Sequence, residues 1–134
     1  MRFPIAIEPG DDIHAFGVIV PDLPGCFSAG DTLDEAIDNA KEAIELWLET
    51  AIDDGGAIPE LRSIGEHQSN PELSGCIWAV VSIDLSELSD KAERVNITLP
   101  ARVLRRIDAA AKAAGESRSG FIARRSLQED LHLR

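Results

Sequence analysis

The pattern of apolar and polar positions in residues 1–84 predicts one long helix and several short strands. Apolar side chains recur at helical spacing from position 33 to position 52, and Thr32 with Glu35 forms a capping-box pattern where this helix begins. Gly55 follows the last helical turn and ends it, and a turn-rich stretch covers residues 57–75. Runs of strand-forming residues predict strands at residues 3–8, 15–20, 26–29 and 76–83. This ββ(β)αβ order predicts an α+β fold, with one helix across one face of a small sheet.

The last third of the chain has the pattern of one strand followed by two helices. Residues 94–99 alternate polar and apolar side chains with period two, and helical spacing follows over residues 101–114 and from about residue 118 to 130. The strand has no partner in its own segment, and so few residues bury too small a core to fold alone. We therefore expect two copies to pair these strands antiparallel. The predicted core of this dimer consists of Val95, Ile97, Leu99, Leu104, Ile107, Phe121 and Ile122.

Charge divides the chain at the same place. Residues 1–90 carry three basic and nineteen acidic side chains, a net charge of −16, whereas residues 91–134 carry ten basic and five acidic ones, a net charge of +5. An asymmetry of this kind between the two parts of a chain indicates two units with different partners. The basic unit suits nucleic acid, although the whole chain is acidic.

Composition narrows the class of protein further. No apolar run approaches the roughly 20 residues that a membrane-spanning helix needs, and the apolar start of the chain is too short for a signal peptide. We therefore expect a cytoplasmic protein without a membrane partner. Cys26 and Cys76 are too few for a disulfide scaffold, and three scattered histidines form no zinc-binding pattern. We expect no metal and no other cofactor.

The basic unit carries a motif of moderate specificity. It reads Arg94-Val-Asn-Ile-Thr-Leu-Pro100, followed by a helix and then by Gly115-Glu-Ser-Arg-Ser-Gly-Phe-Ile122. This pattern resembles the ribbon-helix-helix family of DNA-binding proteins, which implies that a two-stranded ribbon enters the DNA major groove. Arginine suits guanine or phosphate, asparagine suits adenine, and amides at a helix N-terminus suit a phosphate. The predicted DNA-binding residues are Arg94, Asn96, Thr98, Ser117, Arg118 and Ser119.

The most specific motif precedes and begins the long helix. It reads Pro21-Asp-Leu-Pro-Gly-Cys-Phe-Ser-Ala-Gly-Asp-Thr-Leu-Asp-Glu-Ala36. The unit that contains it, residues 3–84, resembles the HicB antitoxin family, in which a ribbon-helix-helix unit can follow. The resemblance implies a truncated ribonuclease-H-like fold, a small RNA-cleaving toxin, HicA, as partner, and repression of the protein's own operon. We expect a toxin-binding domain at 1–84, a linker at 85–93, and a DNA-binding and dimerisation domain at 94–134.

The negative charge of the first domain supports a basic partner independently of the resemblance. A protein that cleaves RNA must attract phosphate, so its working surface is expected to be basic, and an acidic domain complements that surface. The acidic side chains of the long helix lie mostly on one face. The predicted toxin-binding residues are Asp34, Glu35, Asp38, Glu42, Glu45 and Glu49.

Two other functions fit parts of the sequence. A one-component transcriptional regulator would use the same DNA-binding unit, with an acidic domain that senses a ligand or only oligomerises. A metal-dependent nuclease would need several carboxylates that converge on a divalent ion. Asp11, Asp12, Asp22 and Asp31 are available, but they lie in turns and no nucleophile–base pair stands out. We therefore expect no enzymatic activity.

Overall fold

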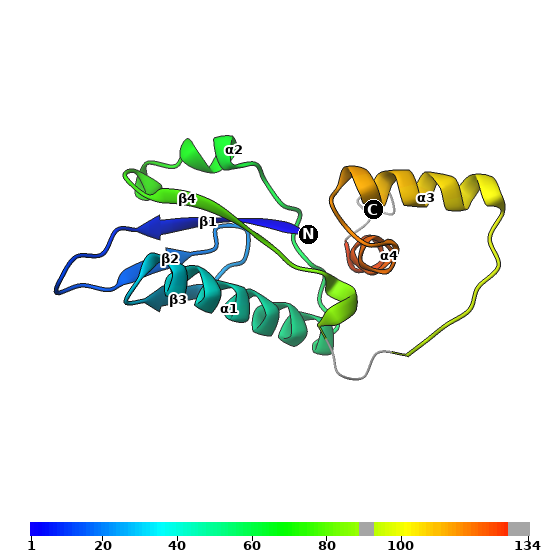
Figure 1. The fold of residues 1–134 in the computed structure, drawn as a ribbon, viewed down its shortest axis with the longest axis horizontal. Helices are drawn as coiled ribbons and strands as arrows, with labels where there is room; N and C mark the ends of the chain where they lie inside the picture. The colour runs from blue at the N-terminus through cyan, green and yellow to red at the C-terminus, as the bar shows by residue number, and fades with distance from the viewer. Residues whose placement is uncertain (89–92, 129–134) are drawn as a thin grey trace.

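A computed structural model describes residues 1–88 and 93–128 of the chain (Figure 1). Four antiparallel strands form one sheet in the order β3-β2-β1-β4. Their bounds are β1 (Arg2–Glu8), β2 (Phe16–Ile19), β3 (Phe27–Gly30) and β4 (Ile77–Ser82). The ββ(β)αβ order predicted from the sequence is confirmed, and each strand end lies within about one residue of its expected position.

The long helix α1 (Leu33–Asp53) runs across one face of the sheet (Figure 1). The Thr32 hydroxyl accepts a hydrogen bond from the Glu35 backbone amide at 3.1 Å, as the capping pattern predicts. Its apolar stripe, Ala36, Ala40, Ile44 and Leu48, is fully buried against the sheet together with Phe3, Ile5 and Ile7 of β1. In residues 1–88 and 93–128, no helix is long and apolar enough to cross a membrane.

The stretch from residue 57 to residue 75 contains more structure than its turn residues predict. It forms a short helix α2 (Ile64–Gln68), capped by Ser63, and a 3₁₀ turn η1 (Pro71–Leu73). His67 of α2 is buried, donates from Nε2 to Asp22 Oδ1 at 3.0 Å, and stacks on Trp78 with ring centroids 6.2 Å apart. These two contacts hold α2 against the face of the sheet opposite α1.

Within residues 93–128, the C-terminal segment forms two helices and no strand. After a 3₁₀ turn η2 (Leu85–Glu87) the described chain continues at residue 93, and residues 94–99 are assigned to no strand. Helices α3 (Ala101–Ala113) and α4 (Arg118–Leu127) follow, joined through Gly115 at a φ of +68°. The expected strand at 94–99 is therefore not formed in the single chain, because an extended segment needs a neighbouring strand for its backbone hydrogen bonds. The predicted end of the last helix, near residue 130, lies outside the described residues.

Helix α4 packs against the sheet unit instead of standing apart from it (Figure 1). Ala123 and Leu127 lie against the hydrophobic core. The Ile58 backbone amide donates a hydrogen bond to the Leu127 carbonyl at 3.1 Å, and Ile58 and Gln128 form a parallel bridge. The two units of opposite charge are thus in direct contact within one chain.

Candidate DNA and protein interfaces

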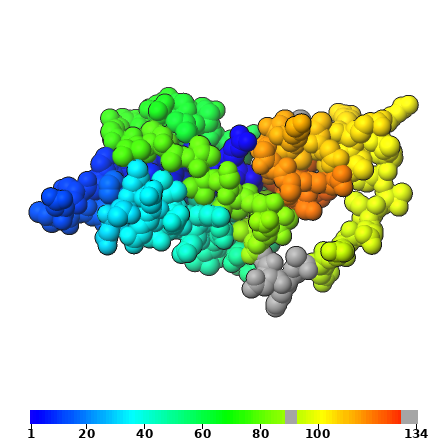
Figure 2. Space-filling model, viewed as in Figure 1, coloured from blue at the N-terminus to red at the C-terminus, as the bar shows by residue number. Residues whose placement is uncertain are grey.

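The segment that the sequence predicts as a DNA-reading ribbon is exposed on both of its faces. Arg94, Asn96 and Thr98 are exposed, as expected for residues that contact DNA. Val95 and Ile97, on the alternate face, are 71% and 66% exposed. Figure 2 shows the yellow-green chain of this segment standing away from the body of the molecule. Two large aliphatic side chains are therefore uncovered where a partner strand is expected.

The predicted dimer core is only partly covered in the single chain. None of its seven residues is buried in the single chain: Val95, Ile97 and Ile122 are exposed, and Leu99, Leu104, Ile107 and Phe121 are half-buried. Val103 on α3 is exposed as well. Helix α4 therefore uses one face, with Ala123 and Leu127, against the sheet unit and leaves the face with Ile122 open.

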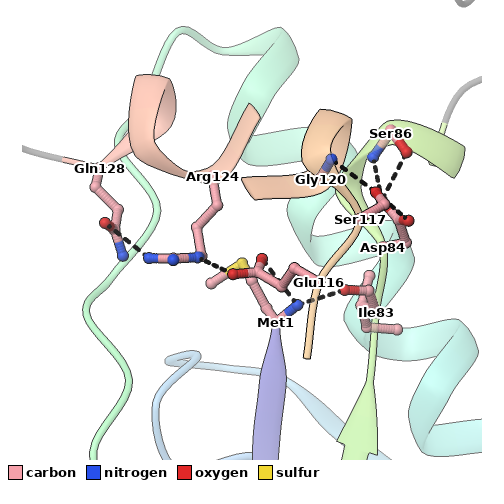
Figure 3. Close-up of polar contacts among 9 residues, drawn as sticks. All are labelled: Met1, Ile83, Asp84, Ser86, Glu116, Ser117, Gly120, Arg124 and Gln128. Atoms are coloured by element: carbon pink, nitrogen blue, oxygen red, sulfur yellow. Dashed lines mark hydrogen bonds and ion pairs between the residues drawn. The ribbon is translucent and has the colours of Figure 1, made fainter. Parts of the chain in front are cut away.

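The N-terminus of α4 already holds a carboxylate of the same chain (Figure 3). The Ser117 side chain caps α4 by accepting from the Gly120 amide at 2.9 Å, and its hydroxyl donates to Asp84 Oδ2 at 2.8 Å. Gly120 is needed at this position, because a Cβ there would lie 2.5 Å from Asp84 Oδ1. Burial raises the pKa of Asp84, but hydrogen bonds from Ser86 and Ser117 outweigh burial and hold this pKa below its usual range.

Arg118 and Ser119, the other predicted phosphate contacts, lie on the exposed first turn of α4. The Arg118 guanidinium donates from Nε and Nη2 to the two carboxylate oxygens of Asp108 on α3, at 2.7 and 2.8 Å. This hydrogen bonding lowers the pKa of Asp108 and raises the pKa of Arg118. Arg118 thus links α4 to α3 by an ion pair at the surface of the protein.

Glu116 forms a second contact between the units that the sequence does not signal (Figure 3). Its side chain is only 3% exposed; Oε1 accepts from Arg124 Nε at 2.7 Å, and Oε2 accepts from the Met1 amine at 3.2 Å. Arg124 also donates from Nη1 to Gln128 Oε1 at 3.2 Å. These partners are far apart in the chain, so no local pattern predicts the buried charge pair.

The predicted toxin-binding carboxylates form a row along α1. Asp34, Glu35, Asp38 and Glu42 are exposed, and Glu45 and Glu49 are half-buried. The helix carries one basic residue, Lys41, within this acidic stretch. The structure therefore presents these side chains to solvent as a negatively charged surface, as the sequence predicts; their contact with a toxin stays a prediction.

An apolar groove of about 460 Å³ lies between α1 and the start of β3, beside the acidic row. Its walls are Phe27, Leu46 and Trp47, and small residues, Gly25, Ala43 and Ala51, line it between them. Phe27 and Leu46 are 66% and 65% exposed, and the Trp47 indole is held in place by its Nε1–H bond to the Pro24 carbonyl at 2.9 Å. The helical pattern of the sequence places Leu46 outside the buried stripe but does not reveal the groove.

The sheet unit has an acidic surface and an apolar groove. It is joined to a basic helix pair that carries an exposed apolar segment. These features are typical of a protein that binds other macromolecules. Family comparison agrees with this description. Residues 3–126 match the HicB-like antitoxin of bacterial toxin-antitoxin systems. The chain belongs to this antitoxin family.

Similar proteins extend the match over nearly the whole chain. An uncharacterized 14.9 kDa protein from the rep-hol intergenic region of Haemophilus phage HP1 is 45% identical over 125 residues, which is 92% of each chain. The crystal structure of the antitoxin HicB of Burkholderia pseudomallei is 45% identical, with a TM-score of 0.76 over 95% of this chain and 96% of that one. A chain of the HicA3 and HicB3 toxin-antitoxin complex is 31% identical, with a TM-score of 0.54 over 63% of this chain and 99% of that one.

Proposed function

We propose that this antitoxin binds and blocks a small HicA-like toxin that cleaves mRNA, and that it represses its own operon by binding operator DNA as a dimer. The observation that carries the proposal is the division of the chain into an acidic sheet unit and a basic helix pair with an uncovered strand segment. The acidic unit suits a basic protein, and the basic unit suits DNA.

Toxin binding is assigned to the sheet unit, residues 1–84. A protein that cleaves RNA needs a basic surface for phosphate, so an acidic unit both attracts it and competes with RNA for that surface. The matched chain of the HicA3 and HicB3 complex corresponds to 63% of this chain, which is about the length of the sheet unit. The sheet with one covering helix is also consistent with the truncated ribonuclease-H-like fold that the family resemblance implies.

DNA binding is assigned to residues 94–134, which would form a ribbon-helix-helix dimer. The linker at 85–93 would connect these residues to the sheet unit. Pairing of residues 94–99 from two copies would satisfy their backbone groups and cover Val95 and Ile97. The opposite face of the ribbon would then carry Arg94, Asn96 and Thr98 from each copy into the major groove. A two-fold ribbon of this kind requires an operator with two-fold symmetry.

Phosphate binding at Ser117 requires a rearrangement. The Ser117 hydroxyl donates a hydrogen bond to Asp84 Oδ2, and a DNA phosphate would need the same donor. Two anions cannot share one donor without strong repulsion, so operator binding through this helix end would open the contact between Asp84 and Ser117. Asp84 therefore links the position of α4 on the sheet unit to the proposed DNA contact.

Asn96→Ala is expected to weaken binding to the operator while leaving non-specific DNA binding nearly unchanged. A side chain that hydrogen-bonds a base edge contributes about 1–3 kcal/mol of discrimination, which corresponds to a loss of about 5- to 150-fold. Gel-shift titrations with operator and with scrambled DNA measure the two affinities. An equal loss on both DNAs would remove Asn96 from base reading.

Operator affinity is expected to fall steeply with salt concentration. The logarithm of the binding constant decreases linearly with the logarithm of salt, with a slope of about −0.9 for each phosphate neutralised. Arg94→Gln is expected to make that slope shallower, whereas Glu93→Gln, at the neighbouring exposed position, is expected to leave it no shallower. A flat salt response of the unaltered protein would contradict phosphate contact.

A further inference from the structure

The groove between α1 and β3 leaves large apolar side chains exposed to solvent. Phe27 and Leu46 come from two different elements, face one shared hollow, and stay about two-thirds exposed. Neither belongs to the buried core, whereas the flanking Trp47 packs partly against it. Large apolar side chains around a groove are typical of the centre of a protein interface. One of them here is Trp47, whose indole is held by its hydrogen bond to the Pro24 carbonyl.

One acidic side chain of the α1 region lines the groove, and two more lie one helical turn from Leu46. Glu42 and Glu49 lie one helical turn before and after Leu46 on the same face of the helix, and Asp54 lines the end of the groove. Lys41 is the only basic residue of α1. An apolar centre with a charged edge is the ordinary arrangement of a specific protein contact.

The charge decides between the possible occupants of the groove. The sheet unit of a second copy would bring another strongly acidic surface against Glu42, Glu49 and Asp54, and like charges facing each other across an interface repel. A protein with basic residues around an apolar side chain would satisfy both parts of the surface. The small basic toxin of the proposed function has this chemistry.

We propose that the toxin docks in the groove of Phe27, Leu46 and Trp47. An apolar side chain of the toxin fills the groove, and basic side chains around it pair with Glu42, Glu49 and Asp54. The apolar contact holds the complex together, and the carboxylates speed its formation. This inference rests on the proposed function and adds to it the surface by which the toxin is held.

Leu46→Ala and Phe27→Ala test the apolar centre. The probe is the HicA-like toxin purified from its complex with this chain, and its affinity is measured by titration calorimetry with full-length antitoxin. Each substitution is expected to raise the dissociation constant about 30-fold, as for the central residue of an interface. Ile13→Ala, at an 88% exposed position in the hairpin between β1 and β2, is the matched control and is expected to change nothing. Because these positions are exposed, all three variants are expected to melt at the temperature of the unaltered protein.

Glu49→Gln tests the acidic edge separately. It is expected to slow association several-fold at low salt and to leave dissociation nearly unchanged, which surface plasmon resonance resolves. If the unaltered chain fails to bind the toxin, the proposed function is overturned. If it binds and Leu46→Ala and Phe27→Ala bind equally well, only the docking site is overturned; a loss with Val80→Ala instead would move the contact to β4. A change in self-association without a change in toxin affinity would assign the groove to a second copy and also overturn the site.

Discussion

Ile97→Asp is expected to convert the proposed antitoxin dimer into monomers and to abolish the proposed binding of operator DNA. Ile97 is 66% exposed in the single chain and would be covered by the partner strand in the paired ribbon. An aspartate there would be buried twice in each dimer without a partner, and one uncompensated buried charge costs about 3–5 kcal/mol. The dimer dissociation constant should therefore rise more than about 100-fold. Sedimentation velocity over a concentration series measures this change.

Thr98→Asp is the matched control for Ile97→Asp. It introduces the same carboxylate at the adjacent position, on the opposite face of the ribbon, where the side chain is exposed. We expect Thr98→Asp to remain a dimer and to lose DNA binding, because its charge faces the phosphates. If Ile97→Asp remained a dimer of undiminished stability, the strand segment would not be the dimer interface, and the ribbon proposal would fail.

Glu116→Ala is expected to destabilise the protein by about 3 kcal/mol, the effect of removing one partner from a buried ion pair. Glu116 is 3% exposed and accepts from Arg124, which is 17% exposed, and from the Met1 amine. Its loss leaves the buried Met1 amine and the half-buried Arg124 guanidinium without a carboxylate. Urea unfolding followed by circular dichroism measures the free energy of unfolding.

Glu60→Ala, at an exposed position, serves as the control for Glu116→Ala and is expected to change stability by no more than about 0.5 kcal/mol. If Glu116→Ala were as mild as Glu60→Ala, α4 would not be held on the sheet unit by this contact in solution. The proposed link between Asp84, Ser117 and the DNA contact would then lose its structural basis.

Local patterns predicted most of the fold of the sheet unit. The capping sequence at Thr32, the helical spacing up to Ile52 and the glycine after the helix each act within a few residues, and the structure confirms all three. Ser117 caps α4 for the same reason. The strands were found because strand-forming residues and turn residues alternate along the first part of the chain.

Contacts between distant residues could not be predicted in this way. The pair of Asp22 and His67 spans 45 positions, and the contact of Ser117 with Asp84 spans 33. Neither pair produces a repeating pattern of residues in the sequence. The packing of α4 on the core could not be predicted either, because Ala123 and Leu127 fit the apolar face of any amphipathic helix.

The candidate sites were predicted in part. The acidic row and the alternation at residues 94–99 follow from sequence, and the side chains of Asp34, Glu35, Asp38, Glu42, Arg94, Asn96 and Thr98 are exposed; their contacts with a toxin or with DNA stay predictions. The groove beside the row depends on how β3 and α1 meet, so only the fold brings Phe27 next to Leu46 and Trp47. Sequence thus predicted the charge of the proposed toxin surface and missed its apolar centre.

The proposed antitoxin activity is tested by inhibition of RNA cleavage. The tagged chain is purified from its native host, the small basic protein that accompanies it is separated under denaturing conditions and refolded, and its cleavage of mRNA is measured with and without the chain. We expect a stoichiometric partner that cleaves mRNA alone and is inhibited by an equimolar amount of this protein. A chain that purifies without such a partner, yet still binds its own promoter DNA, would contradict the antitoxin mechanism and indicate a one-component regulator.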